Sequence, residues 1–199
     1  MNGLLLGGLV VLLLVLRQPL IVVLLAVAAY IHMVWGRGQL DYIVEDMWVG
    51  IDKELILSIP LFILCGNVMT RGSIAKRLVD MLQAVTRPLP GGLAVACVLS
   101  CAVFAAISGS SIVTMLAVGS VLYPAMRKAG YDNKFTLGAI MSGGTLGIII
   151  PPSIPMIIYG LVTETSIVDL FLAGFGPGIL LTLLLSGYAV WMNRHRPRE

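Results

Sequence analysis

Two stretches rich in small residues and proline interrupt otherwise apolar segments of this sequence. The first is Ser108–Ser111, with the sequence Ser-Gly-Ser-Ser, and the second is Gly147–Pro155, which contains Pro151, Pro152 and Pro155. Each proline lacks a backbone N–H, so the carbonyl one turn earlier loses its helical donor. Such carbonyls, with neighbouring hydroxyls, suit a monovalent cation such as sodium. Helix N-termini near Ile112 or Ile154 would offer N–H groups to an anion.

The surroundings of these breaks indicate a transport site. Non-helical backbone at membrane depth survives only where it is buried in protein or lines a cavity. Two broken hydrophobic segments close together in a sequence point to the ion and substrate site of a transporter. The alternative is that the prolines and glycines only kink packed helices. The presence of two breaks, one of them at the tip of an expected hairpin, favours the transport site.

The composition predicts an integral membrane protein, because 58% of the residues are hydrophobic and only 12% are charged. The net charge of +3 comes from short basic clusters between apolar spans, so we expect no nucleic-acid partner. The three cysteines lie inside apolar segments and are interpreted as ordinary buried residues. The N-terminus has no basic region or cleavage site, so residues 1–16 are expected to be a retained span.

The elements that must position the breaks follow from hydropathy and charge. We predict an all-α membrane protein with about five transmembrane helices, a surface amphipathic helix and a re-entrant helical hairpin, one repeat of an inverted-repeat, ion-transporter-type fold. The expected parts are scaffold helices in 1–70, the cytoplasmic surface helix in 71–90, the hairpin in 91–126, a broken transmembrane helix in 133–163, the last transmembrane helix in 166–193 and a cytoplasmic tail in 194–199.

Basic residues set the expected orientation. They concentrate at 71–87, 127–134 and 194–198, and the positive-inside rule places all three clusters in the cytoplasm. The N-terminus is then periplasmic and the C-terminus cytoplasmic. Residues 91–126 must leave and return to the same side, either as two full spans or as a re-entrant hairpin. The turn at 108–111 lacks the charges and aromatics of a loop in water, which favours the hairpin.

Five motifs resemble the large membrane subunit of TRAP (tripartite ATP-independent periplasmic) transporters. They are Pro60-Leu61-Phe62-Ile63-Leu64-x-Gly66-Asn67, Ser108-Gly109-Ser110-Ser111, Tyr123-Pro124-x-Met126-x-Lys128-x-Gly130-Tyr131-Asp132, Gly147-x-x-x-Pro151-Pro152-Ser153-x-Pro155 and Phe171-Leu172-Ala173-Gly174-x-x-Pro177-Gly178. The resemblance implies a multi-pass protein of the bacterial inner membrane that uses a sodium gradient to import organic acids such as C4-dicarboxylates or sialic acids. It also implies two partners, a small four-helix membrane subunit and a periplasmic substrate-binding protein.

The resemblance further implies which residues bind. On the matching positions, the sodium ion would be held by Ser108, Ser111, Gly147, Ile150 and Pro152. Candidates for contact with the carboxylate substrate are Ser110, Thr145 and Ser153. No organic cofactor and no catalytic residue are expected.

The sequence departs from the family pattern in length, because it contains only the first of two inverted repeats. We expect a second polypeptide to carry the missing C-terminal repeat, the alternative being a truncated, non-transporting membrane remnant. An intramembrane serine hydrolase is a further alternative, because Gly109-x-Ser111 resembles a serine protease motif. It would need a histidine base, whereas His32 and His195 are expected near membrane surfaces. The chain is therefore interpreted as a transporter component and not as an enzyme.

Overall fold

The computed structural model describes residues 2–36 and 41–194, and within these ranges the chain is helical and contains no strand. The prediction of an all-α protein is confirmed. The chain forms two compact units, residues 1–54 and 55–199, which are considered separately below. Apart from Arg194, the predicted tail 194–199 lies outside the described residues.

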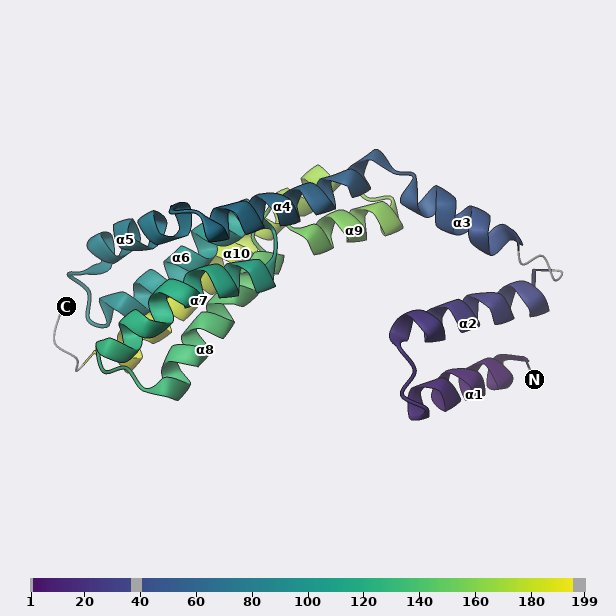
Figure 1. The fold of residues 1–199 in the computed structure, drawn as a ribbon, viewed down its shortest axis with the longest axis horizontal. Helices are drawn as coiled ribbons and strands as arrows, with labels where there is room; N and C mark the ends of the chain where they lie inside the picture. The colour runs from purple at the N-terminus through teal and green to yellow at the C-terminus, as the bar shows by residue number, and fades with distance from the viewer. Residues whose placement is uncertain (1, 37–40, 195–199) are drawn as a thin grey trace. The chain divides into compact units, whose positions relative to one another are not determined.

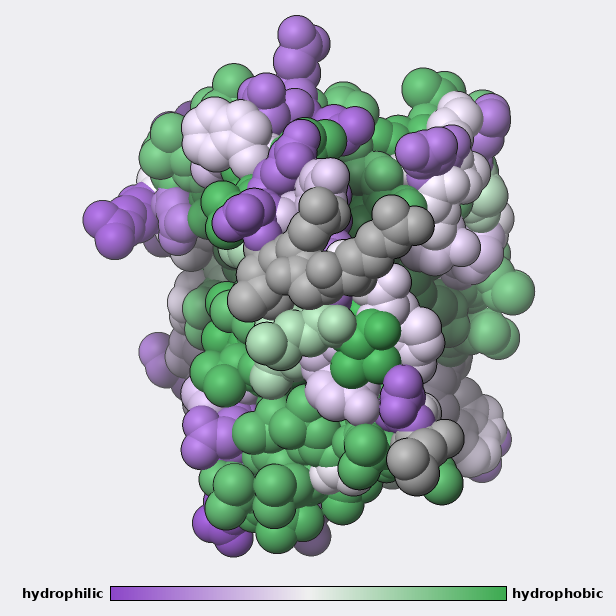
Figure 2. All heavy atoms as spheres, turned by 90° about the vertical axis from the view of Figure 1, so that its right-hand side faces the viewer, coloured by the Kyte–Doolittle hydropathy of each residue, from purple (hydrophilic) through white to green (hydrophobic). Residues whose placement is uncertain are grey.

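The first unit consists of three helices, α1 (Asn2–Val15), α2 (Leu20–Val34) and α3 (Asp41–Ile51). The helices α1 and α2 pack against each other, and the Tyr30 hydroxyl of α2 donates to the carbonyl of Asn2 at 3.2 Å. Most of their large apolar side chains are exposed, with Leu4 85% accessible, and hydrophobic residues cover much of the face in Figure 2. A surface of this kind fits helices that face lipid rather than water.

The second unit contains the predicted site. A 3-10 helix, Glu54–Leu57, leads into α4 (Ser58–Arg71), and the remaining elements are α5 (Ile74–Thr86), α6 (Gly92–Ser108), α7 (Ser111–Lys128), α8 (Asn133–Gly144), a 3-10 turn η2 (Thr145–Ile148), α9 (Ile154–Thr163) and α10 (Ile167–Met192). In Figure 1, α6 runs among α5, α7, α8 and α10, each of which contacts it.

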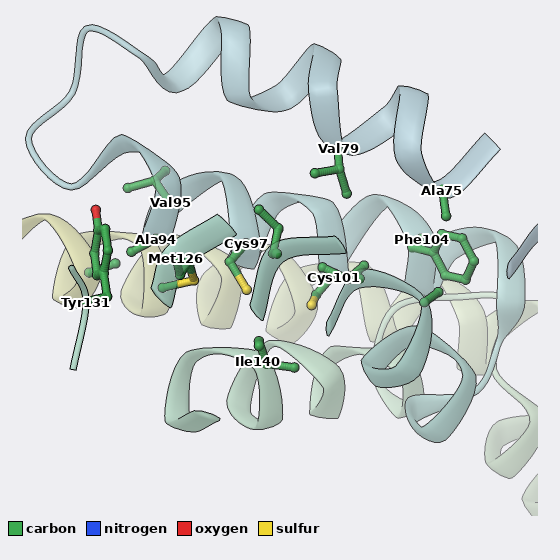
Figure 3. Close-up of a cluster of buried hydrophobic side chains, with 14 residues drawn as sticks. Ala75, Val79, Ala94, Val95, Cys97, Cys101, Phe104, Met126, Tyr131 and Ile140 are labelled. Atoms are coloured by element: carbon green, nitrogen blue, oxygen red, sulfur yellow. The ribbon is translucent and has the colours of Figure 1, made fainter. Parts of the chain in front are cut away.

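The core of this unit forms around α6. Its small side chains, among them Ala94, Cys97 and Cys101, are fully buried and let the neighbouring helices approach closely. Ala75 and Val79 extend from α5 toward α6 in Figure 3. The inner face of α5 is therefore part of the core, and the expected position of its outer face at a membrane surface stays a prediction.

Two segments are long and apolar enough to cross a membrane, residues 54–71 and α10. The helices α1, α2, α6 and α9 are apolar but shorter, with 14, 15, 17 and 10 residues. A crossing needs about 20 residues, unless the helix tilts or the bilayer thins. The number of transmembrane crossings and the re-entrant nature of 91–126 therefore stay predictions.

Candidate functional site

The two interruptions predicted from the sequence lie against each other. The helix α6 ends at Ser108, Gly109 turns the chain with a left-handed φ of 62°, and α7 begins at Ser111. A residue with a β-carbon adopts that φ only with strain, which accounts for the glycine. The N–H of Ile154, the first residue of α9, donates to the carbonyl of Gly109 at 3.1 Å. The hairpin tip (Ser108–Ser111) is thus bonded directly to the segment that follows the prolines.

Close backbone contact at this junction depends on two glycines. A β-carbon on Gly147 would lie 2.7 Å from the backbone nitrogen of Ser111, and one on Gly109 would lie 2.9 Å from the carbonyl oxygen of Pro152. Both distances are shorter than real carbon contacts, so any other residue would push the tip away from the break. The structure therefore places Gly147 and Pro152 beside the predicted residues of the tip.

In the break, residues 149–153 between η2 and α9, a new hydrogen-bond donor replaces the missing backbone N–H for one of the freed carbonyls. Pro152 has no N–H for the carbonyl of Ile148, and the hydroxyl of Ser153 donates to that carbonyl at 2.8 Å instead. Ser153 is fully buried, so its hydroxyl has a structural partner. Pro151 likewise cannot donate to the carbonyl of Gly147. A β-carbon on Gly147 would meet the backbone of Ser110 and Ser111, so Gly147 lies directly against the hairpin tip.

Helix ends add charge of both signs to the junction. The C-termini of α6 and η2 bring partial negative charge, and the N-termini of α7 and α9 bring partial positive charge. The N-cap residues Ser110 and Ser153 make no side-chain cap to their own helices. In α9 the N–H of Ile154 is already bonded to Gly109 and Pro155 has no N–H, so an anionic group would meet mainly the N-terminus of α7. The junction can therefore interact with a cation on its carbonyls and with an anionic group on its N–H groups.

The other predicted residues are distributed unevenly. The Ser111 hydroxyl is buried and has no hydrogen-bond partner among the described residues. The side chain of Ile150 packs against α10, where a β-carbon on Gly178 would meet it at 2.8 Å. Thr145 is exposed, and its hydroxyl donates to the carbonyl of Ser142 at 2.7 Å. Of the substrate candidates, only Ser110 contributes backbone at the point where Gly147 meets the tip.

Sequence reasoning missed two residues at the tip. Thr114, in the first turns of α7, is fully buried, and its hydroxyl oxygen lies 2.8 Å from that of Ser108. Gly66 of α4 packs over the same turn, since a β-carbon there would lie 2.9 Å from Val113 and 3.4 Å from Ser108. The signal for Thr114 was a lone hydroxyl in an apolar run, one helical turn after Ser110.

Comparison with known proteins places the sequence in a transporter family. A model of the family described as "Tripartite ATP-independent periplasmic transporter, DctM component" matches residues 6–198. An ectoine TRAP transporter large permease protein of Halomonas elongata is 41% identical over 165 residues, which cover 83% of this chain and 39% of the relative.

Two further relatives carry other substrate names. A C4-dicarboxylate TRAP transporter large permease protein of Pseudomonas aeruginosa is 50% identical over 130 residues, covering 65% of this chain and 30% of the relative. A 2,3-diketo-L-gulonate TRAP transporter large permease protein of Escherichia coli is 35% identical over 199 residues, covering 99% of this chain and 46% of the relative. The chain thus spans less than half the length of these curated relatives.

Proposed function

The chain belongs to the family of the DctM component of tripartite ATP-independent periplasmic transporters, and from this premise we propose that it forms the sodium-binding first repeat of a permease that imports carboxylates. The observation that carries the proposal is the contact between the hairpin tip and the proline break, where Gly147 lies against Ser111. In this proposal the protein crosses the bacterial inner membrane, with its basic clusters in the cytoplasm.

The residues at the junction fit a sodium ion. Sodium takes oxygen ligands, and Ser108 and Gly147 would supply backbone carbonyls from the C-terminal ends of α6 and η2, where the partial charge is negative. Pro152 would supply a further carbonyl from the break itself. The buried hydroxyl of Ser111, which has no hydrogen-bond partner within residues 2–36 and 41–194, belongs to the same hairpin tip. Entry of sodium down its gradient would supply the free energy for uptake, about 2.3 kcal/mol per charge for each 100 mV of membrane potential.

The partial positive charge of a helix N-terminus at the same junction supports a substrate that carries a carboxylate. The relatives are named for a C4-dicarboxylate, for 2,3-diketo-L-gulonate and for ectoine, and each of these compounds carries a carboxylate. The N-terminus of α7 would receive such a group, with its N-cap residue Ser110 as the predicted contact. Because the chain spans less than half of these relatives, we propose that the missing repeat, a small membrane subunit and a periplasmic binding protein complete the transporter.

A sodium titration of the 199-residue chain in lipid nanodiscs tests this function. Replacement of Gly147 by alanine adds one carbon at 2.7 Å from the Ser111 nitrogen, so we expect the variant to lose most of its sodium binding. Gly138→Ala is the matched control. Gly138 lies in α8, shortly before Gly147 in the chain, and a β-carbon there would meet no atom within 4 Å. The control variant should bind sodium as the wild type does, and lithium and potassium should compete poorly in both.

Absence of saturable sodium binding leads to one further experiment, in which the second repeat is co-expressed. Binding that appears only in the co-expressed complex supports a site completed by both repeats. Absence of binding there as well would contradict the proposal and would favour a non-transporting remnant.

A further inference from the structure

We propose that Thr114 is a positioning residue for the hairpin tip, holding the Ser108 hydroxyl inside the core so that Ser108 presents its backbone carbonyl, and not its side chain, to the ion. This inference rests on the proposed sodium site. It concerns a residue that the sequence analysis did not single out and that is not itself an ion ligand.

The geometry that carries the inference is a buried pair of hydroxyls. Ser108 is the last residue of α6 and Thr114 lies in the first turns of α7, and both side chains are fully buried. Their oxygens are hydrogen bonded at 2.8 Å, which ties the two helices together across the tip. The Ser108 hydroxyl is also 3.4 Å from the backbone nitrogen and from the carbonyl oxygen of Ser110, so all its contacts are internal to the hairpin.

The pair has an orienting role because no other side-chain hydrogen bond within the described residues links α6 to α7 across the turn. Glycine, present at position 109, has the widest range of backbone dihedral angles of any residue, and the Ser110 side chain does not cap α7. From outside the hairpin, the carbonyl of Gly109 is bonded only to Ile154 in the described part of the chain. A hydroxyl pair surrounded by apolar residues is costly to leave unpaired, so it favours one arrangement of the tip.

Packing from α4 restricts the same turn on another side. A β-carbon on Gly66 would lie 3.4 Å from the β-carbon of Ser108, so the Ser108 side chain has little room to rotate outward. With its hydroxyl bonded inward, Ser108 has only its backbone carbonyl left to offer as an oxygen ligand. Thr114 therefore acts on the ion through Ser108.

The experiment replaces Thr114 by valine, which keeps the branched shape and removes the hydroxyl. Thr136→Val is the matched control, because Thr136 is equally buried but donates within its own helix, to the carbonyl of Asp132 at 2.8 Å. We expect Thr114→Val to bind sodium about three- to tenfold more weakly, with a reduced preference for sodium over lithium. Thr136→Val should change neither, and Thr114→Ser should restore both.

A second readout does not depend on the ion. With both proteins measured in the absence of sodium, backbone hydrogen exchange of the peptide that covers residues 105–114 should be faster in Thr114→Val than in the wild type. In Thr136→Val it should be unchanged. If the wild type binds no sodium, the proposed function fails while this readout still tests the tip. Unchanged exchange in Thr114→Val would overturn the inference, and so would unchanged sodium affinity in a chain that binds the ion.

A double variant completes the test. Because Ser108 and Thr114 act as one pair, Ser108→Ala combined with Thr114→Val should weaken sodium binding no more than either change alone. Losses that multiply in the double variant would mean that the two hydroxyls act independently, which contradicts the inference.

Discussion

At the junction, the side chain of Ser153 replaces a backbone N–H that proline lacks. The break would leave the carbonyl of Ile148 without a donor inside an apolar protein, and the hydroxyl of Ser153 supplies one. An unpaired buried carbonyl costs about 1–3 kcal/mol, so a serine directly after the two prolines has a structural reason to be there. This assigns Ser153 to the stability of the break, whereas its predicted contact with substrate remains to be tested.

Asp132 stabilises the opposite end of α8. Its carboxylate accepts hydrogen bonds from the backbone N–H groups of Phe135 and Lys134, the N-cap arrangement. The bond from Phe135 contributes most to lowering the pKa of the exposed Asp132 carboxyl below its usual value. The folded protein therefore favours the charged form. Its contribution to stability is present above the unfolded pKa of about 3.9 and is lost as pH falls through the lower, folded value.

Replacement of Asp132 tests this cap. Asp132→Ala should lower the melting temperature of the detergent-solubilised protein at pH 7, because two N–H groups of α8 lose their acceptor. Asp132→Asn keeps a good cap and should melt near the wild type. It should also remove this residue's share of the stability loss on acidification below pH of about 4. Equal melting temperatures for all three proteins at pH 7 would rule out a stabilising cap.

At the scale of elements, the central helix α6 is built for close contact. Its buried face consists largely of alanine, cysteine and valine, and α8 meets it with Gly143. A β-carbon on Gly143 would lie 2.9 Å from the sulfur and 3.1 Å from the β-carbon of Cys101. Close approach of this kind replaces hydrophobic burial as the main attraction between helices in lipid. It also holds α8 and the break that follows it at a defined distance from the hairpin.

Overpacking of the contact between α6 and α8 should destabilise the second unit. Gly143→Val should lower the free energy of unfolding by about 1–3 kcal/mol in chemical denaturation, since neither helix can move without disturbing the rest of the core. Gly138→Val, on the same helix but facing open space, is the control and should cost less. Adding Cys101→Ala to Gly143→Val should recover part of the loss. A Gly143→Val protein as stable as the control would contradict this packing.

At the scale of the molecule, residues 91–126 have two possible arrangements in a membrane, a re-entrant hairpin or two full spans. The helices α6 and α7 have 17 and 18 residues, which is short of or near the length of a crossing. The tip is bonded to Ile154 and packed against Gly147, and Ser108 and Gly109 within it are buried. The helix lengths suit either topology, and the contacts of the tip are those expected of the predicted re-entrant hairpin.

Cysteine labelling with a membrane-impermeant reagent distinguishes these topologies. Cys65 is replaced by serine, and the buried Cys97 and Cys101 serve as the unlabelled background. Thr165→Cys should react from the periplasm and Lys128→Cys only from the cytoplasm. Ser110→Cys, at the tip, should react from neither side in intact membranes. Labelling of Ser110→Cys from the periplasm as fast as Thr165→Cys would show two full spans.

Sequence alone predicted the features that depend on local chemistry. Hydropathy marks apolar helices wherever they pack, and proline interrupts a helix because its nitrogen carries no hydrogen, so the all-α class and the two non-helical stretches were predictable. The expectation that both stretches form one site came from their order and from the family resemblance. In the structure the two stretches do touch, with Gly147 against Ser110 and Ser111, and Gly109 against Pro152.

The tertiary structure alone decided which polar atoms at the junction have hydrogen-bond partners within the protein. The pairing of Ser108 with Thr114 depends on how Gly109 turns the chain, and a left-handed glycine is not visible in a sequence. The hydroxyl of Ser153 donates to the carbonyl of Ile148 across the break. Gly147 packs against Ser111, which is far from it in the chain. Hydrogen-bond partners are set by distances of a few tenths of an ångström, and only the folded arrangement of α6, α7 and α9 determines them.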